Sequence, residues 1–314
     1  MAVVDRLSPL ASVSATREVL SRHGLSTKKQ LGQNFLINDD VLCKIVKLAG
    51  LTENDAVLEV GPGIGTLTIA LLKSAQCVVS VERDPDLPAV LAETCAPWRD
   101  AFRLISKDAL DLDAADVRTE LESMGAPGFP AKFVANLPYA VAATIVLDFF
   151  ERFSELESAT VMVQKEVADR MAADPGSKNY GAYTVKLRMH AQPAGRFSVG
   201  PGNFFPPPHV ESSVIRLDRA TPQAACSAAT ELDRPVEEVV RATCTMADAA
   251  FATRRKTLSN SCKTYFGGRG SEGKRMAAEL PRLFETAEID PKRRGESLDE
   301  GEFIRLGAAY LRLL

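Results

Sequence analysis

The chain has 314 residues, of which 46% are hydrophobic and 25% are charged, the composition of an ordinary globular protein with one large domain or two. No stretch approaches the roughly 20 consecutive apolar residues that span a bilayer. The first twenty residues carry Asp5, Arg6, Arg17 and Glu18, so they lack the apolar core of a signal peptide. Six scattered cysteines without a C-x-x-C pair, and three histidines far apart in sequence, predict neither a zinc site nor a disulfide framework. We therefore expect a cytoplasmic protein that contacts no membrane and holds no metal.

The N-terminal region combines a leader, a short helix and a basic segment. Residues 1 to about 14 are rich in Ser, Ala and Val, which is typical of a mobile leader. The spacing of apolar residues predicts a helix over Thr16–Arg22. A polar segment that begins with Lys28 and Lys29 follows it.

A strand, a tight turn and a helix are expected at residues 56–72. The apolar run Ala56–Val60 leads into three glycines at every second position, and a helical pattern of apolar residues begins at Leu67. Glycines let the backbone pass close to a ligand, and the helix N-terminus offers unpaired N–H groups. The turn reads E-x-G-x-G-x-G, whereas dinucleotide-binding turns read G-x-G-x-x-G, so the spacing predicts a site for S-adenosylmethionine instead of NAD. Its members are Glu59, Gly61, Gly63 and Gly65.

The next strands each end near a polar side chain. They are Cys77–Val81 before Glu82, Phe102–Ile105 before Asp108, and Lys132–Ala135 before Asn136. Alternation with helices predicts a parallel, doubly wound sheet, whose ligands lie at the carboxyl ends of the strands. Glu82 is placed to accept hydrogen bonds from both hydroxyls of a ribose. Asp108 either accepts a hydrogen bond from a purine amino group or only forms a turn.

The second half of the chain first continues the α/β pattern and then becomes helical. The expected elements are a helix at Ala142–Phe153, a strand at Ala159–Val163, helices at Gln164–Met171 and Tyr183–His190, a stiff proline-rich segment at Gly200–Val210 and a strand at Ser213–Leu217. From Pro235 onward every apolar run has helical spacing. The expected division is a leader and first helix at 1–27, an α/β domain at 28–220, a linker at 221–234 and a helical domain at 235–314.

The sequence Asn-Leu-Pro-Tyr at a strand end suits the methylation of an exocyclic amine. If the Asn136 amide oxygen and the Leu137 carbonyl accept the two hydrogens of an adenine N6, the nitrogen lone pair is freed to attack a sulfonium methyl. Pro138 stiffens this array because its φ is fixed and it has no N–H. Tyr139 offers a face on which the base can stack, and Phe204 could close the other face. Catalysis would then be mostly positioning, and the target base must be unpaired or flipped out.

Basic residues gather locally although the whole chain is mildly acidic. The formal net charge is −3, but residues 234–314 contain 15 Lys and Arg against 12 Asp and Glu. Such a cluster is either a solvated face or a contact for phosphates. The candidate RNA-binding residues are Lys28, Lys29, Arg254, Arg255 and Lys256.

Five motifs in this order make the chain resemble the KsgA/RsmA-type ribosomal RNA adenine dimethyltransferase family over about residues 16–314. They are the segment KKQLGQNFL at 28–36, the glycine turn at 59–65, Asn-Leu-Pro-Tyr at 136–139, the segment NFFPPPHVESSV at 203–214, and RRKTL at 254–258. A second phenylalanine, Phe205, follows Phe204, and either ring could be the one that stacks on the base.

The resemblance implies a Rossmann-like class I methyltransferase sheet with a small, all-helical C-terminal domain that recognises rRNA. It also implies transfer of methyl groups from S-adenosylmethionine to the N6 atoms of two adjacent adenosines in the 3′-terminal hairpin of 16S rRNA. The substrate would be a partly assembled, pre-30S-like particle, and we expect the protein to be a monomer. The implied cofactor contacts are Asn34, Leu36, Gly61, Glu82, Asp108 and Asn136, and the glycine turn adds Gly63.

Three other functions fit parts of the sequence. Methyltransferases of the erythromycin-resistance type share the Asn-Leu-Pro-Tyr kind of motif but modify large-subunit rRNA; the RRKTL segment favours the small-subunit enzyme. A non-catalytic assembly or transcription factor on the same fold would not need intact glycines, Glu82, Asp108 and Asn136. A small-molecule methyltransferase would not need the basic helical domain.

Overall fold

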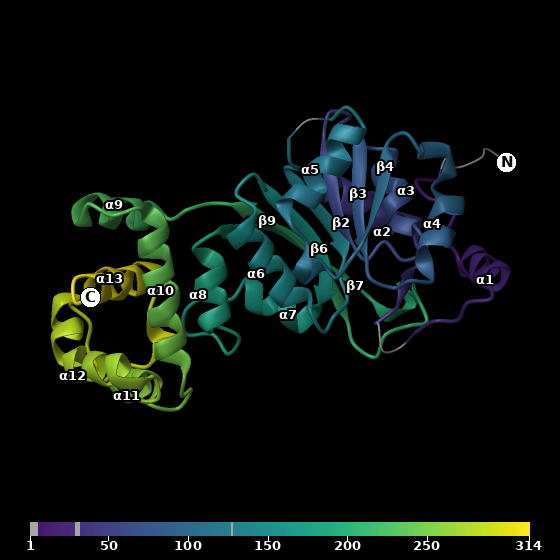
Figure 1. Cartoon of the computed structure of the whole chain (residues 1–314). Coiled ribbons are helices and arrows are strands. Elements are labelled where there is room, and N and C mark those ends of the chain that lie inside the picture. The colour runs from purple at the N-terminus through teal and green to yellow at the C-terminus, as the bar shows by residue number, and fades with distance from the viewer. Residues whose placement is uncertain (1–5, 29–31, 127) are drawn as a thin grey trace. The chain divides into compact units, whose positions relative to one another are not determined.

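The computed structural model describes residues 6–28, 32–126 and 128–314 (Figure 1). The chain divides into two compact units. Unit 1 contains Met1–Ala168 and Pro193–Arg219, and unit 2 contains Asp169–Gln192 and Ala220–Leu314.

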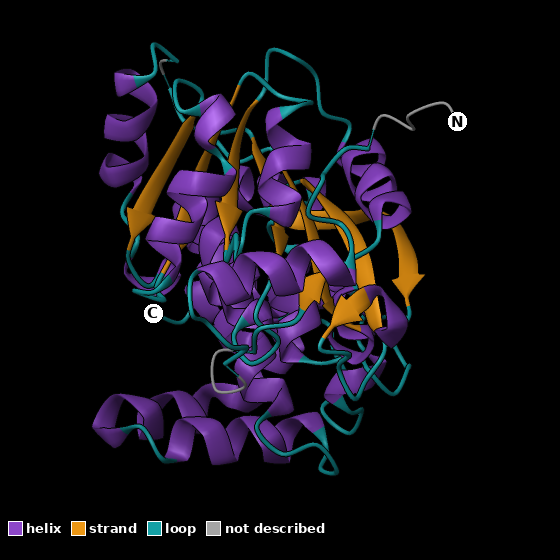
Figure 2. Cartoon of the chain, turned by 90° about the vertical axis from the view of Figure 1, so that its right-hand side faces the viewer, coloured by secondary structure: helices purple, strands orange, loops and turns teal. Residues whose placement is uncertain are grey.

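Unit 1 is built on a seven-stranded sheet with the order β4-β3-β2-β5-β6-β9-β7. Figure 2 shows the strands of the chain in orange. Strands β2 to β6 pair in parallel, and β9 runs antiparallel to β6 with Ala159 opposite Leu217. The predicted parallel, doubly wound arrangement is therefore confirmed for five strands. The bounds are β2 Ala56–Val60, β3 Cys77–Glu82, β4 Phe102–Ser106, β5 Lys132–Asn136, β6 Ser158–Gln164, β7 Ala191–Val199 and β9 Ser212–Arg219.

Helices pack on both faces of this sheet because adjacent strand residues point to opposite sides. Val134 on β5 shares a hydrophobic core with helices α2, α3 and α4. Its neighbour Phe133 points the other way and packs against Phe149 on α6, with 5.0 Å between ring centroids. The bounds of the unit 1 helices are α1 Val13–Arg22, α2 Asp39–Ala49, α3 Thr66–Leu72, α4 Leu87–Thr94, α5 Ala114–Ser123 and α6 Ala142–Arg152. Helix α7, Lys165–Met171, begins in unit 1 and ends in unit 2.

A small second sheet joins two segments of unit 1 that lie far apart in the sequence. Strand β1 (Phe35–Leu36) pairs antiparallel with β8 (Phe204–Phe205), so that Leu36 lies opposite Phe204. The Ile37 N–H donates to the Asn203 carbonyl at 2.9 Å and extends this pairing. Two motifs about 170 residues apart in sequence thus lie side by side.

The expectation of a mobile leader is wrong for its described part. Leu10 and Ala11 are buried in the core of unit 1, and Ser8 is fully buried. The Asp39 carboxylate at the start of α2 accepts the N–H groups of Leu7 and Ser8 at 3.0 and 2.9 Å. Residues 6–12 are therefore docked on unit 1 before α1 begins at Val13.

Unit 2 is helical, and it includes the segment that was expected to be a linker. Residues 223–232 form α9, whose Ala225 and Ala229 pack against Val239 on α10. Helix α8 also belongs to this unit, since Val185 is buried with Met246 and Phe303. The bounds are α8 Ala182–Arg188, α9 Gln223–Leu232, α10 Val236–Phe251, α11 Leu258–Gly267, α12 Gly270–Thr286 and α13 Glu300–Leu311. None of the helices in the described part of the chain is long and apolar enough to cross a membrane.

Candidate active site

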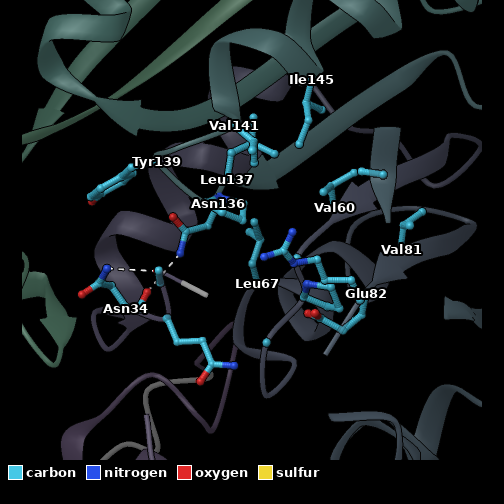
Figure 3. Close-up of a pocket in the computed structure, with 18 of the residues that line it drawn as sticks. Asn34, Val60, Leu67, Val81, Glu82, Asn136, Leu137, Tyr139, Val141 and Ile145 are labelled. Carbon is cyan, nitrogen blue, oxygen red and sulfur yellow. Dashed lines mark hydrogen bonds between the residues drawn. The ribbon is translucent and has the colours of Figure 1, made fainter. Parts of the chain in front are cut away.

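The predicted cofactor-binding residues line one cavity of about 430 Å³ at the carboxyl edge of the unit 1 sheet (Figure 3). The loops after β2, β3, β4 and β5 all contribute to its wall, as expected for parallel strands. The predicted residues in this wall are Asn34, Leu36, Gly61, Gly63, Glu82, Asp108, Asn136, Leu137, Pro138 and Tyr139.

The glycine turn brings bare backbone to the cavity wall. Gly63 has φ +60°, a left-handed conformation that favours glycine. A Cβ at this position would lie 3.0 Å from Cε1 of Phe35, another lining residue. A larger residue would therefore both strain the turn and displace the ring that faces it.

Two carboxylates lie on neighbouring strand ends beside this turn. Glu82 accepts the Asp84 N–H at 2.8 Å, which fixes the orientation of its carboxylate. Burial raises the pKa of Glu82, while hydrogen bonds from backbone N–H groups, Gly63 among them, oppose the rise. Asp108 accepts the Leu110 N–H at 3.1 Å and forms an ion pair with Arg83 at 3.2 Å. These are the hydrogen-bond acceptors that a ribose and an amino group require.

The opposite wall carries two oxygen atoms that receive no hydrogen bond from the described residues. The Asn136 amide donates through Nδ2 to the Asn34 carbonyl at 3.2 Å, so its oxygen points elsewhere (Figure 3). Among the described residues, no donor reaches the Asn136 Oδ1 or the Leu137 carbonyl oxygen. Tyr139 is held through its hydroxyl, which lies 2.5 Å from the Ser212 Oγ. Burial raises the pKa of Tyr139, so the phenol stays protonated at neutral pH.

Phe204 is the predicted site residue that the structure places outside the cavity. Its side chain is 2% exposed, belongs to the hydrophobic core of unit 1, and is absent from the described lining. The pairing of β8 with β1 buries this side chain. Phe205 also packs against this core, with the Arg17 guanidinium 5.0 Å from its ring centroid. Neither ring lines the cavity in this conformation.

The two lysines of the N-terminal motif have different outcomes. The Lys28 ammonium forms ion pairs with Asp84 at 2.6 Å and Asp86 at 2.5 Å. Its charge is therefore already matched inside unit 1, which argues against a phosphate contact. Lys29 lies outside the described residues.

Several lining residues were not singled out from the sequence. Gln164 ends β6 and could have been found by the rule that selected Glu82 and Asn136. Arg83 directly follows Glu82. Gln33 also lines the cavity and contacts Asp84, a pairing of segments distant in sequence that no local pattern indicates.

In unit 2, two basic segments converge at the start of α11. The Leu258 N–H donates to the Arg293 carbonyl at 2.7 Å, which places residues 292–294 beside Arg254-Arg255-Lys256. Arg254 donates to the Lys178 carbonyl at 2.6 Å, so its charge is not neutralised by that contact. Within the described chain, the side chains of Arg255, Lys256 and Lys292 have no ion-pair partner. All three are exposed. We call Arg254, Arg255, Lys256 and Lys292 the basic patch.

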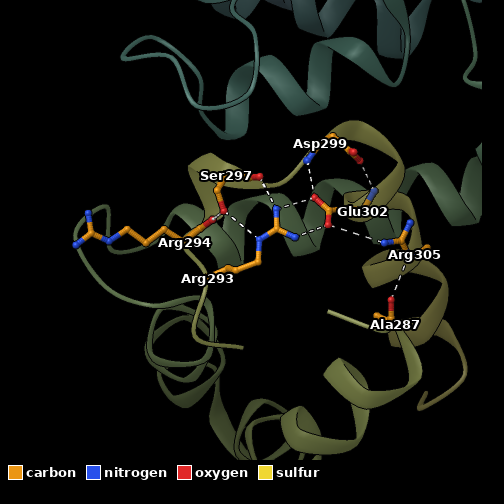
Figure 4. A network of polar contacts seen from close by, with 7 residues as sticks. All are labelled: Ala287, Arg293, Arg294, Ser297, Asp299, Glu302 and Arg305. Carbon is orange, nitrogen blue, oxygen red and sulfur yellow. Dashed lines mark hydrogen bonds and ion pairs between the residues drawn. The ribbon is translucent and has the colours of Figure 1, made fainter. Parts of the chain in front are cut away.

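Arg293 differs from its neighbours because it holds the fold of unit 2 (Figure 4). Its guanidinium pairs with Glu302 on α13 and donates to the Ser297 carbonyl. Glu302 in turn accepts the Asp299 N–H at 3.0 Å in a capping box at the start of α13. Figure 4 shows Arg294 extending away from this network. Arg293 is therefore structural, and the basic patch lies around it.

The described residues contain no group of three or more His, Cys, Asp or Glu side chains that could hold a metal ion.

Comparison with known proteins identifies the kind of protein to which this cavity belongs. The family model for ribosomal RNA adenine dimethylase matches residues 24–305. The chain belongs to this family. It is 38% identical over 301 residues to the ribosomal RNA small subunit methyltransferase A of Enterococcus faecalis, which covers 96% of both chains. It is 41% identical to the protein of the same name from Rhodococcus erythropolis, over 92% of this chain and 90% of the other.

Solved structures of other dimethylases and methyltransferases share the fold. A dimethyladenosine transferase from Plasmodium falciparum aligns with a TM-score of 0.66 and 22% identity, over 87% of this chain and 95% of that one. The 23S rRNA methyltransferase ErmE aligns with a TM-score of 0.59 and 22% identity, over 88% and 99%. The expected class I methyltransferase sheet with C-terminal helices is thus confirmed, as is the family resemblance.

Proposed function

We propose that this chain uses S-adenosylmethionine to dimethylate the N6 atoms of two adjacent adenosines in the 3′-terminal hairpin of small-subunit rRNA. Membership of the ribosomal RNA adenine dimethylase family supports this proposal. So do the two relatives named ribosomal RNA small subunit methyltransferase A, each of which matches at least nine-tenths of this chain. The 23S rRNA methyltransferase supports only the fold, because it is 22% identical.

The observation that carries the chemistry is the pair of open acceptors at the end of β5. The Asn136 Oδ1 and the Leu137 carbonyl oxygen receive no donor within the described chain, and both residues line the cavity. An adenine N6 group that donates its two hydrogens to them would have its lone pair released from the ring. Pro138, which follows, cannot compete as a donor. Each transfer replaces one N6 hydrogen, which leaves as a proton to water, so the wall needs no strong base and acts by positioning.

The rest of the cavity fits the cofactor. S-adenosylmethionine would supply an electrophilic methyl group on a sulfonium. The Glu82 carboxylate is oriented by the Asp84 N–H and would accept from ribose hydroxyls, while Asp108 would accept from the adenine amino group. Gly61 and Gly63 leave the backbone bare on the same side. Asn34 and Leu36 also line the cavity.

Recognition of the target base would fall to Tyr139 in this conformation, because Phe204 is buried in the core, Phe205 packs against that core, and neither lines the cavity. An adenine inside an RNA helix cannot reach a cavity of this kind, so the base must be unpaired or flipped. The basic patch of unit 2 would contact rRNA phosphates. We further propose that the protein acts in the cytoplasm as a monomer on a partly assembled small subunit.

A methyl-transfer assay with isolated ribosomal subunits tests the function. Radiolabelled S-adenosylmethionine is supplied with small subunits from cells that lack this modification, and with large subunits in parallel. We expect label in the small-subunit rRNA alone. Label in the large subunit would favour the erythromycin-resistance type, and cofactor binding without any transfer would favour a non-catalytic assembly factor.

A further inference from the structure

Asp84 is not itself a lining residue of the cavity, but it contacts two of them, Gln33 and Glu82. Its side chain is 1% exposed, although it carries a charge and lies in the loop just after β3. Through its N–H it donates to Oε1 of Glu82 at 2.8 Å. Through its carboxylate it accepts from Nε2 of Gln33 at 2.7 Å and from Nζ of Lys28 at 2.6 Å.

These contacts tie the segment before β1 to the loop after β3. Gln33, which lines the cavity, also accepts the Lys28 N–H at 2.9 Å through Oε1. Both polar ends of the Gln33 amide are therefore used, one by Lys28 and one by Asp84. The next residues along the chain, Asn34 to Leu36, form the wall that faces the glycine turn.

The Asp84 carboxylate is stabilised in its ionised state. Burial alone raises the pKa of Asp84, but the hydrogen bonds from Lys28, the Asp86 N–H and Gln33 outweigh it, so the pKa lies below its usual value. Asp84 is thus a buried carboxylate with a cation and two further donors. A buried charge-assisted hydrogen bond of this kind contributes more to stability than a neutral contact at the surface. If one partner is removed, the other stays buried without a partner, which costs free energy.

We infer that Asp84 is a positioning residue for cofactor binding: with Lys28 it clamps Gln33, and hence the Asn34–Leu36 wall, against the loop that carries Glu82. Lys28, which the sequence suggested as an RNA contact, then acts on the cofactor side of the reaction. The inference rests on the proposed function, since it assigns the clamp to the S-adenosylmethionine end of the cavity.

Three variants separate this role from a general effect on folding. Asp84→Asn keeps the shape and removes the charge. Lys28→Met keeps the aliphatic part of the side chain and removes its terminal ammonium. Asp86→Asn is the matched control, because Asp86 contacts the same ammonium but its side chain is 47% exposed. Unfolding without cofactor is followed for each variant, so that a loss of fold is recognised.

Equilibrium binding of S-adenosylmethionine is the first measurement. We expect the Kd to rise about tenfold in Asp84→Asn and in Lys28→Met, and less than about twofold in Asp86→Asn. The double variant Lys28→Met/Asp84→Asn should bind S-adenosylmethionine no more weakly than the weaker-binding single variant, because both changes break the same clamp. If Asp84→Asn fails to fold, Lys28→Met carries the test alone.

Steady-state kinetics provide the readout that a merely structural role would not move. The KM for S-adenosylmethionine should rise in both variants, while kcat at saturating cofactor and the KM for small subunits stay at wild-type values. Unchanged cofactor affinity in folded Asp84→Asn and Lys28→Met would overturn the inference. So would a Lys28→Met variant that raises only the KM for subunits, which would return Lys28 to RNA binding. A wild-type chain that binds no S-adenosylmethionine would overturn the proposed function itself.

Discussion

At the scale of single residues, the orientation of the Asn136 amide decides what the cavity can do. Its nitrogen is used by the Asn34 carbonyl, so its oxygen is the atom left for a substrate donor. Under the proposed function this oxygen would hold the target amine, while Glu82 and Asp108, which line the same cavity, would hold the cofactor.

Asn136→Ala should therefore lower the rate of methyl transfer by at least about a hundredfold, since the acceptor that positions the reacting nitrogen is removed. We expect the Kd for S-adenosylmethionine to change by less than about threefold, equivalent to roughly 0.7 kcal/mol. Single-turnover transfer and equilibrium binding measure the two effects. Wild-type turnover in this variant would exclude the acceptor role.

Glu59 should make stability depend on pH. Its side chain is 1% exposed, and burial raises its pKa to about 7 although the Thr68 and Ser80 hydroxyls donate to it. The folded chain thus keeps a proton that the unfolded chain releases from about pH 4.5, so the stability from this group is full below pH 4.5 and is lost as the pH rises to about 7.

Glu59→Gln cannot ionise and should avoid this loss. The advantage of the variant over wild type should grow as the pH rises from about 4.5 to about 7, and it should reach roughly 3 kcal/mol. Urea denaturation at several pH values measures the difference. A difference that stays constant across this range would contradict the raised pKa.

Three residues of the cavity could be located from the sequence because each lies at or just after the end of a strand. Glu82, Asp108 and Asn136 were found because parallel strands carry ligand contacts at their carboxyl ends, and all three line the cavity. The structure differs from the expectation at Lys28 and Phe204 because their surroundings come from distant segments: the Asp84 loop for Lys28, and the β1–β8 pairing for Phe204. Whether the lining residues bind cofactor stays a prediction.

At the scale of elements, unit 2 depends on the close approach of α10 and α13. A Cβ on Gly307 of α13 would lie 2.7 Å from the Thr243 nitrogen and 2.9 Å from its Cα on α10, so backbone would have to move. Gly301, on the same helix, has nothing nearer to such a Cβ than Asp299 Oδ1 at 3.5 Å. The two glycines form a matched pair.

Gly307→Ala should destabilise unit 2 by about 2–3 kcal/mol, because overpacking forces the helices apart. Gly301→Ala should be neutral or stabilise it by up to about 1 kcal/mol through helix propensity. Chemical denaturation followed by circular dichroism measures both. Equal effects of the two substitutions would mean that α13 does not pack on α10 as described.

Three segments of the fold were not predicted from the sequence, and each has a physical reason. Strand β7 contains Pro193 and Gly195, which lower strand propensity but are tolerated because β7 is at the edge of the sheet. Helix α9 has the Ala, Ser and Thr content of a linker, yet alanine is the best helix former. Residues 6–12 have only a short apolar run, which does not indicate the surface on which the segment docks.

At the scale of the whole molecule, basic residues are concentrated in unit 2 while the chain carries a net charge of −3. The convergence of residues 254–256 and 292–294 was not visible in the sequence, because the two segments lie nearly forty residues apart. Arg255, Lys256 and Lys292 extend this charge to the surface without partners in the described chain.

Substituting Arg255, Lys256 and Lys292 by Ala should weaken binding to small subunits. For every phosphate that is no longer neutralised, the slope of log Kd against log salt should also fall by about 1. Arg282→Ala is the control, because Arg282 is exposed on α12 outside the patch. Binding at several salt concentrations measures both effects, and unchanged slopes would mean that the patch is only solvated.

The most direct test of the account is the product itself. Small subunits that lack the modification are incubated with the wild-type chain and S-adenosylmethionine, and the 3′-terminal rRNA fragment is analysed by mass spectrometry. We predict two adjacent N6,N6-dimethyladenosines in that fragment, and far less of this product from the Asn136→Ala variant over the same incubation time. An unmodified fragment, or methyl groups at another base or in the large-subunit rRNA, would contradict the proposed function.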